Sequence, residues 1–163
     1  IRSTSSRYDA GLSDGFAQFT PSEALGREVF FRSDTRCNQC HSGLNFFATQ
    51  PFINGLDTDY AAAGDGGIGA LTGEADDDGR FKTVSLRNVG LTAPYMHDGR
   101  FQTLEEVIDH YSEGLKPSPT IDPLMKKVEQ GGVGLSPQEK SDLIAFLKSL
   151  TDVEFGRAFT TQN

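Results

Sequence analysis

Cys37-Asn38-Gln39-Cys40-His41 is the stretch of this 163-residue sequence that decides the fold. Its pattern, C-x-x-C-H, is typical of the covalent attachment of a c-type haem. Two thiols add to the two vinyl groups of one haem, and the imidazole that follows binds the iron as its proximal ligand. A histidine whose second ring nitrogen is held by a backbone carbonyl makes a strong, well-oriented ligand. The stretch therefore predicts one covalent haem c held by Cys37, Cys40 and His41.

Other sites that use paired cysteines fit this stretch less well. A thioredoxin-like motif needs a strand before it and a helix after it, and it gives no reason for the histidine. A zinc site needs more ligands, yet the sequence has no third cysteine and only two other histidines, His97 and His110. A disulfide between Cys37 and Cys40 would close a loop too small to stabilise the chain much.

The composition is that of a globular protein with one domain, since 36% of the residues are hydrophobic and 23% are charged. No run approaches the 18 apolar residues of a membrane-spanning helix, so we expect no membrane span. The net charge of −8 argues against nucleic acid as a partner. An acidic surface would suit a basic redox partner protein.

The first residue is Ile1 rather than methionine, from which we expect a processed product or a fragment. Haem c is attached outside the cytoplasm. The use of the motif, rather than the composition, therefore predicts a periplasmic or otherwise extracytoplasmic location.

The first half of the chain is expected to hold one helix between an arm and a long loop. Residues 1–19 are rich in Ser, Gly and Asp and predict an extended arm or linker. Residues 20–23 (T-P-S-E) form a capping box that opens a helix ending around residues 32–33, and Gly26 in its middle permits the close approach of another helix. Residues 42–80 read as loop. Their apolar side chains, expected to wall the haem pocket, are Phe46, Phe47, Phe52, Ile53 and Leu56.

Two more capping boxes open helices in the second half, at residues 103–106 (T-L-E-E) and 136–139 (S-P-Q-E). The apolar stripe of the first of these helices points Tyr111 inward and leaves His110 at the surface. A short helix is expected at residues 123–128.

This order of helices predicts an all-α fold like that of a class I cytochrome c, in which the first and last helices cross, with long loop insertions at 42–80 and 112–135. The predicted organisation is an arm over residues 1–19, a cytochrome c domain over residues 20–152 and a C-terminal tail over residues 153–163. In the tail, Phe155 and Phe159 are candidate docking points.

The sequence resembles the bacterial dihaem cytochrome c peroxidases and their MauG-like relatives, which include the dihaem enzyme that matures methylamine dehydrogenase. Four stretches carry the resemblance beside C-x-x-C-H. They are residues 81–88 (F-K-T-V-S-L-R-N), 91–99 (L-T-A-P-Y-M-H-D-G), 103–106 and 135–147 (L-S-P-Q-E-K-S-D-L-I-A-F-L). Together they cover the predicted cytochrome c domain.

The resemblance is to the C-terminal half of that family, whose members usually carry two haem domains in tandem. In the family the N-terminal haem reacts with peroxide and the C-terminal haem transfers electrons. This implies electron transfer through one haem, with a separate redox partner protein or a missing N-terminal haem domain as the partner. The alternative is a haem enzyme, a peroxidase or MauG-like oxidase, acting through this haem with a Tyr or an open sixth position. His97 would be the nearby acid–base group, although the family gives that histidine a structural role.

The sixth iron ligand has three candidates. The family position, near the end of the helix after the P-Y-x-H-D-G motif, falls on Tyr111, where the family has Met in peroxidases and Tyr in the methylamine branch. Met96 is the chief alternative, because a thioether is the usual partner of His in electron-carrying haems. Met125 is the third, placed upstream of the last helix as in simple cytochromes. A Tyr oxygen stabilises ferric iron and favours high-valent chemistry, whereas a Met sulfur favours reversible electron transfer.

Two further contacts are expected around the haem. Arg87 is a candidate partner for a haem propionate, since a buried dianionic haem needs counter-charge. The family also binds calcium between its two domains. The matching residues here are Thr92 and Pro94, which would bind Ca²⁺ through their backbone carbonyls.

Overall fold

The computed structural model of the chain describes residues 3–125 and 127–160. Its α-helices are α1 (Arg7–Asp14), α2 (Pro21–Phe31), α3 (Cys37–Cys40), α4 (Gly69–Thr72), α5 (Leu104–Glu113), α6 (Pro137–Ser149) and α7 (Val153–Thr160). Short 3₁₀ turns, η1 (Ala75–Asp77), η2 (Val89–Leu91) and η3 (Val128–Gln130), and two short strands, β1 (Pro51–Phe52) and β2 (Phe81–Lys82), complete the described elements.

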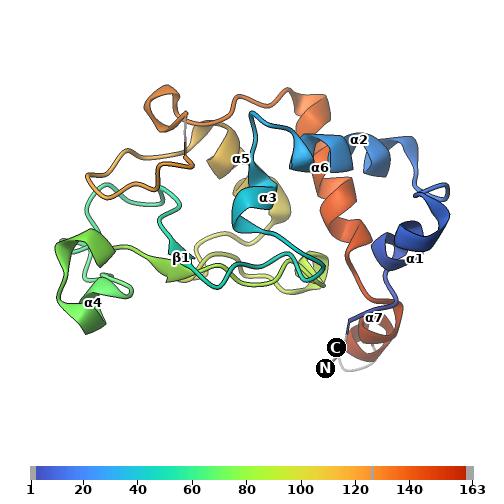
Figure 1. Cartoon of the computed structure of the whole chain (residues 1–163), viewed down its shortest axis with the longest axis horizontal. Coiled ribbons are helices and arrows are strands. Elements are labelled where there is room, and N and C mark those ends of the chain that lie inside the picture. The colour runs from blue at the N-terminus through green and yellow to red at the C-terminus, as the bar shows by residue number, and fades with distance from the viewer. Residues whose placement is uncertain (1–2, 126, 161–163) are drawn as a thin grey trace.

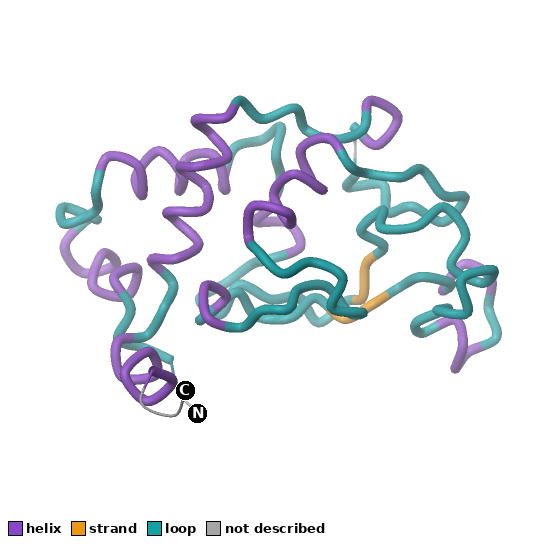
Figure 2. The backbone as a smooth tube through the Cα atoms, turned by 180° about the vertical axis from the view of Figure 1, so that it is seen from behind, coloured by secondary structure: helices purple, strands orange, loops and turns teal. Residues whose placement is uncertain are grey.

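Helices and loops occupy different halves of the molecule. The helices α1, α2, α6 and α7 gather at one end, and the long loops with α4 and the two strands fill the other (Figure 1). The view from behind has the same division (Figure 2). The one-turn helix α3 lies between the two halves together with α5, so the C-x-x-C-H stretch stands where helical core and loops meet. Within the described residues, none of the helices combines the length and the apolar character that crossing a membrane requires.

The three helices predicted from capping boxes begin where expected. Thr20, Thr103 and Ser136 are the N-caps of α2, α5 and α6. In each case the hydroxyl accepts a hydrogen bond from the backbone N–H of the glutamate three residues on, and that glutamate accepts one from the backbone N–H of the cap. Each pair satisfies two N–H groups that the first helical turn leaves without a partner. These starts are therefore fixed by local sequence.

Helices α2 and α6 cross at Gly26, as the sequence predicted for a glycine in mid-helix. A Cβ added at Gly26 would lie 1.9 Å from the backbone oxygen of Asp142 and 2.9 Å from the Cβ of Phe146. Neither atom can move aside without moving α6, because one is a backbone oxygen and the other is the first side-chain carbon of Phe146. The crossing of the first and last predicted helices, the feature expected of a cytochrome c domain, therefore depends on the absence of a side chain at Gly26.

An aromatic cluster joins these helices to the loop that follows the C-x-x-C-H stretch. Phe30 of α2, Phe146 of α6 and the loop residue Phe46 are nearly or fully buried, with ring centroids 5.2 to 6.2 Å apart. Tyr8 of α1 packs edge-on against Phe46 at 5.0 Å. We had expected Phe46 to wall the haem pocket beside Phe47. Phe46 belongs to the helical core, against which Cys37 also packs, and Phe47 is 38% exposed, so their place in a haem pocket stays a prediction.

Both ends of the chain contain helices that the sequence analysis did not predict. The extended arm expected over residues 1–19 is wrong for α1, which begins with a capping box between Ser6 and Asp9. That box has Asp where the others have Glu, so the pattern was missed. The tail expected over residues 153–163 contains α7, where the half-buried Phe155 donates its backbone N–H to Asp152. The side chain of Phe159 lies outside the described part of the chain.

The loops also differ in detail from the prediction. The fold is not purely α-helical, because β1 and β2 pair antiparallel, with Pro51 opposite Lys82 and Phe52 opposite Phe81. The helix expected at residues 123–128 is absent from the described residues there. Its place is taken by a turn in which the Asp122 carboxylate accepts the backbone N–H of Leu124, a local bond that competes with helix formation.

Replacement of Gly26 by alanine tests the helix crossing. Gly26→Ala is expected to lower the free energy of unfolding by about 1–3 kcal/mol, because the added methyl group forces α2 and α6 apart. The measurement is the urea midpoint at constant m-value. Gly90→Ala is the matched control, since its Cβ would meet nothing closer than 3.4 Å. Equal midpoints for the two variants would contradict the packing role of Gly26.

Candidate haem site

The two cysteines lie on a single helical turn. Cys37 and Cys40 open and close α3, and both are free thiols. Arg36, at a φ of 56°, turns the chain into this helix, and the backbone N–H of His41 bonds to the carbonyl of Cys37 at 2.9 Å. Burial raises the pKa of Cys37 to about 11 and that of Cys40 to about 12. Both sulfurs are therefore neutral thiols, fixed on one side of one turn.

His41 is held in one orientation by the loop that follows it. Its Nδ1 lies 3.1 Å from the backbone oxygen of Phe46, which also accepts the N–H of Leu86 at 3.3 Å. Phe46 has a φ of 52°, a conformation that directs its carbonyl back at the imidazole while its ring stays in the core. Because Nδ1–H donates to this carbonyl, Nε2 carries the ring lone pair. This is the arrangement that makes a histidine a strong, well-oriented ligand. Burial lowers the pKa of His41, so the ring is neutral.

Tyr111 on α5 interacts electrostatically with the two cysteines. Burial is the main cause that raises its pKa to about 12; the Asn54 side chain opposes this rise, and nearby Cys40 and Cys37 add to it. The phenol is thus protonated. Tyr111 is half-buried, whereas the buried residues of α5 include its neighbours His110 and Ser112, so the inward direction of Tyr111 stays a prediction.

The two methionines differ in their surroundings. Met96 has a φ of 71°, which is uncommon for a residue with a side chain, and its sulfur accepts the Nδ2–H of Asn54 at 3.6 Å. Met125 is half-buried in the turn after Asp122, whose carbonyl accepts its backbone N–H at 2.8 Å. Of the two, Met96 is tied through Asn54 to the surroundings of Tyr111.

His110 is buried rather than at the surface, so that prediction is wrong. Its exposed fraction is 6%, and its Nε2 donates to the backbone oxygen of Asn54 at 3.0 Å. Burial lowers the pKa of His110, in keeping with a neutral ring. The sequence analysis took only the most apolar stripe of α5 as its buried face. A loop carbonyl that needs a donor explains why a histidine is also buried there.

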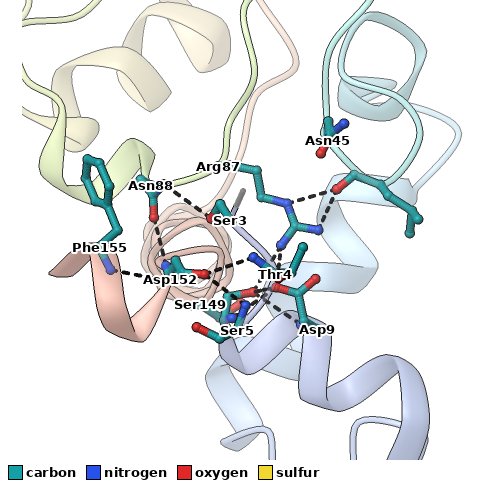
Figure 3. A network of polar contacts seen from close by, with 12 residues as sticks. Ser3, Thr4, Ser5, Asp9, Asn45, Arg87, Asn88, Ser149, Asp152 and Phe155 are labelled. Carbon is teal, nitrogen blue, oxygen red and sulfur yellow. Dashed lines mark hydrogen bonds and ion pairs between the residues drawn. The ribbon is translucent and has the colours of Figure 1, made fainter. Parts of the chain in front are cut away.

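Arg87 is engaged by protein groups on every guanidinium nitrogen. One terminal nitrogen bonds to Asp9 at 2.8 Å and to Ser6 at 3.1 Å, and the other nitrogens bond to the Leu44 carbonyl at 2.6 and 2.9 Å (Figure 3). Only 7% of its side chain is exposed. These contacts do not support the predicted pairing with a propionate. Arg87 instead joins α1 to the loop between His41 and Phe46.

Asp152 forms a second polar centre next to Arg87 (Figure 3). One of its carboxylate oxygens accepts the backbone N–H groups of Thr4 and Ser5 at 2.9 Å each, and the other caps the start of α7. Its own N–H donates to the side chain of Asn88 at 2.8 Å. Hydrogen bonds from Ser5 and Phe155 lower the pKa of Asp152 to about 2. The sequence analysis did not predict this centre.

The predicted calcium ligands are the backbone carbonyls of Thr92 and Pro94. Thr92 and Pro94 are exposed, and in the residues that the structure describes no group of three or more His, Cys, Asp or Glu side chains is arranged to hold a metal ion. Calcium binding stays a prediction.

His97, the acid–base candidate, stacks on Phe81 with ring centroids 3.5 Å apart and pairs with Asp65 at 2.6 Å. These contacts favour a structural role for His97.

The donor set fits a haem c. Two free thiols are spaced by one helical turn, a neutral imidazole has one nitrogen already engaged, and a neutral phenol lies near the thiols. A buried oxygen, Oδ1 of Asn54, has no hydrogen-bond partner among the described residues. Such groups are uncommon in folded proteins and point to a further ligand or to a functional constraint.

Comparison with known proteins gives consistent relatives, although no family model matches the chain. The chain is 33% identical over 144 residues to the cytochrome-c peroxidase IdrP1 of Pseudomonas sp. (strain SCT), which covers 88% of this chain and 32% of that protein. It is 31% identical over an alignment of 185 residues to the methylamine utilization protein MauG of Paracoccus denitrificans (strain Pd 1222), covering 90% of this chain and 46% of that one.

A solved structure agrees with these relatives. The crystal structure of a MauG-like protein associated with microbial copper homeostasis matches 93% of this chain and 49% of its own, at 38% identity and a TM-score of 0.79. The chain thus spans between about a third and a half of the length of these relatives.

Removal of the Asp152 charge tests the centre that joins the two ends of the described chain. The folded-state pKa lies below the ordinary value of 3.8, so the carboxylate stabilises the fold fully above about pH 4, and this contribution is lost as the pH falls toward about 2. Asp152→Asn is expected to cost about 1–3 kcal/mol at neutral pH and to flatten the acid side of the stability curve. Urea midpoints at neutral and acid pH measure both effects.

The helix residue Glu28 provides the control, because Glu28→Gln removes one negative charge at an exposed position. An Asp152→Asn variant with the acid dependence of the unaltered protein would show that the carboxylate is not the group responsible.

Proposed function

We propose that this chain, which belongs to the family of cytochrome c peroxidases and MauG proteins, carries electrons through one covalently attached haem c as the electron-transfer part of a cytochrome c peroxidase-like system. The observation that carries the proposal is the environment of His41. Its imidazole is neutral and oriented by the Phe46 carbonyl in a half-buried residue, directly after two free thiols on a single turn. No simpler role explains these three features together.

In this proposal, Cys37 and Cys40 hold the haem through thioether bonds and His41 provides the proximal ligand. When bound, haem c supplies an iron centre that takes up and releases one electron. The Phe46 carbonyl keeps the His41 ring from rotating and raises its basicity. Because Phe46 is itself anchored among Phe30 and Phe146, the ligand is supported by the main core.

Tyr111 is the group that we propose for the opposite side of the iron. It is half-buried, and its phenol interacts electrostatically with both thiols. If His41 and Tyr111 both held the iron, no position would be left for peroxide, and electron transfer would be favoured over direct catalysis. A phenolic oxygen also stabilises the ferric form, so we expect a low reduction potential.

The partner in this system is proposed to be a second haem domain or a separate redox protein, since the relatives are two to three times as long as this chain. The net charge of −8 would suit a partner with a basic surface. An extracytoplasmic location follows from the attachment chemistry, and the backbone carbonyls of Thr92 and Pro94 remain our proposal for part of a calcium site.

The proposal is tested by producing the chain in a bacterium that attaches haem c outside the cytoplasm. We expect a mass increase equal to one haem that survives acidic acetone, and its loss in the double variant Cys37→Ser, Cys40→Ser. Each single variant should keep the haem through the remaining thioether. The purified protein should take up one electron reversibly, and hydrogen peroxide should leave its spectrum unchanged.

A prompt spectral change with peroxide and turnover of a reducing substrate would favour the alternative, a haem enzyme with an accessible sixth position. A colourless protein would overturn both functions.

Replacement of Tyr111 tests the distal ligand. Tyr111→Phe keeps the ring and removes the oxygen, so we expect the oxygen-ligated ferric spectrum to disappear and the reduction potential to rise. Optical and electron paramagnetic resonance spectra of the ferric protein and a redox titration measure the change. Tyr95→Phe is the control, because it removes a phenolic oxygen that donates to the Val89 carbonyl and is no candidate ligand. Identical spectra for Tyr111→Phe and the unaltered protein would exclude Tyr111 as a ligand.

A further inference from the structure

The loop after β1 fixes the backbone of Asn54 against α5. The Asn54 carbonyl accepts the Nε2–H of His110 at 3.0 Å, and the next residue, Gly55, has a φ of 70° and accepts the N–H of Lys116 at 2.8 Å. Leu56 then donates its N–H to the hydroxyl of Tyr60 at 3.0 Å. Three residues, His110, Lys116 and Tyr60, thus hold this stretch. The Asn54 side chain starts from a rigid base, and its direction is set by the fold.

That side chain lies between the two leading candidates for the distal ligand. Its Nδ2–H donates to the Met96 sulfur at 3.6 Å, and its side chain also hydrogen-bonds the Tyr111 phenol. Thioether sulfur is a weak hydrogen-bond acceptor, so an amide held against it engages the lone pair that a metal would use. Met96 also adopts a left-handed backbone conformation, at a φ of 71°, which indicates that the protein constrains this residue.

The fold alone does not explain an asparagine at this position. Its Oδ1 is buried and lacks a partner in the described part of the chain. An unpaired buried oxygen destabilises a protein, and an apolar side chain of similar shape would avoid that cost. A residue with this penalty is retained where it serves another requirement, and the requirement visible here is control of its two neighbours.

We propose that Asn54 is a positioning residue that selects the distal ligand: its amide holds the Met96 thioether at hydrogen-bond distance, which keeps that sulfur from the iron and leaves the position to Tyr111. This inference rests on the proposed function, because it presupposes the haem. It adds a reason why a chain with two methionines and one suitably placed tyrosine would use oxygen. It also implies that the ligand can be exchanged without altering Tyr111 itself.

The test uses the haem-loaded chain and nuclear magnetic resonance of methyl-labelled methionine in the ferrous state. The chain has two methionines, Met96 and Met125, so Met125→Leu assigns the signals. A methionine bound to haem iron has a methyl signal shifted strongly upfield by the porphyrin ring. We expect both signals at ordinary positions in the unaltered protein, and the Met96 signal shifted upfield in Asn54→Leu, with a higher reduction potential.

Further variants keep the result specific. Asn54→Leu combined with Met96→Leu should lose the shifted signal, and Asn54→Asp, which keeps the shape but replaces the donor nitrogen, should release Met96 as well if the leucine variant does not fold. Asn45→Leu, at an exposed asparagine, is the control and should change nothing. A purely structural role for Asn54 would alter stability without bringing Met96 to the iron.

The outcomes separate this inference from the function on which it rests. Retained haem with both methionine signals unshifted in all Asn54 variants would overturn the role of Asn54 and leave the electron-transfer proposal intact. A Met96 signal already shifted in the unaltered protein would do the same. Absence of haem from every variant would overturn both proposals.

Discussion

The hydrogen bond between His41 and the carbonyl of Phe46 is the interaction on which the rest of the structure depends. It lies where the two halves of the molecule meet, with the helical core on one side and the loops on the other. The ring of Phe46 belongs to the aromatic cluster of α2 and α6, while its carbonyl faces the imidazole. One residue thus serves both core and site, so the ligand geometry is a property of the whole fold.

The two polar centres of Figure 3 extend this support to the ends of the described chain. Arg87 joins α1 to the carbonyl of Leu44, close to His41, and Asp152 joins the residues before α1 to the start of α7. Asn88 lies between them and bonds to Asp152 and Ser3. Charge-assisted bonds of this kind hold segments that bury few apolar side chains. The residues first read as an arm and a tail are in this way part of the same domain surface.

Local sequence was enough for much of the fold and for the proximal side of the site. The caps Thr20, Thr103 and Ser136 fixed three helix starts because a capping box needs only four consecutive residues. The C-x-x-C-H pattern identified His41 as the proximal candidate, but not the Phe46 carbonyl that orients it. The contacts of Arg87 and the burial of His110 could not be predicted in this way, because their partners lie 43 to 81 residues away for Arg87 and 56 for His110. Such pairings are set by tertiary structure, which has no short-range pattern.

The left-handed backbone at Phe46 makes the chemistry at His41 sensitive to packing several residues away. If the cluster around Phe146 loosened, the carbonyl of Phe46 would turn with its ring, and the imidazole of His41 would lose its hydrogen-bond acceptor. The imidazole would then be a weaker ligand for iron before the chain unfolded. Colour would then change ahead of helix content during heating. In a haem-loaded chain, haem absorbance would therefore report loosening of the aromatic cluster before the helices unfold.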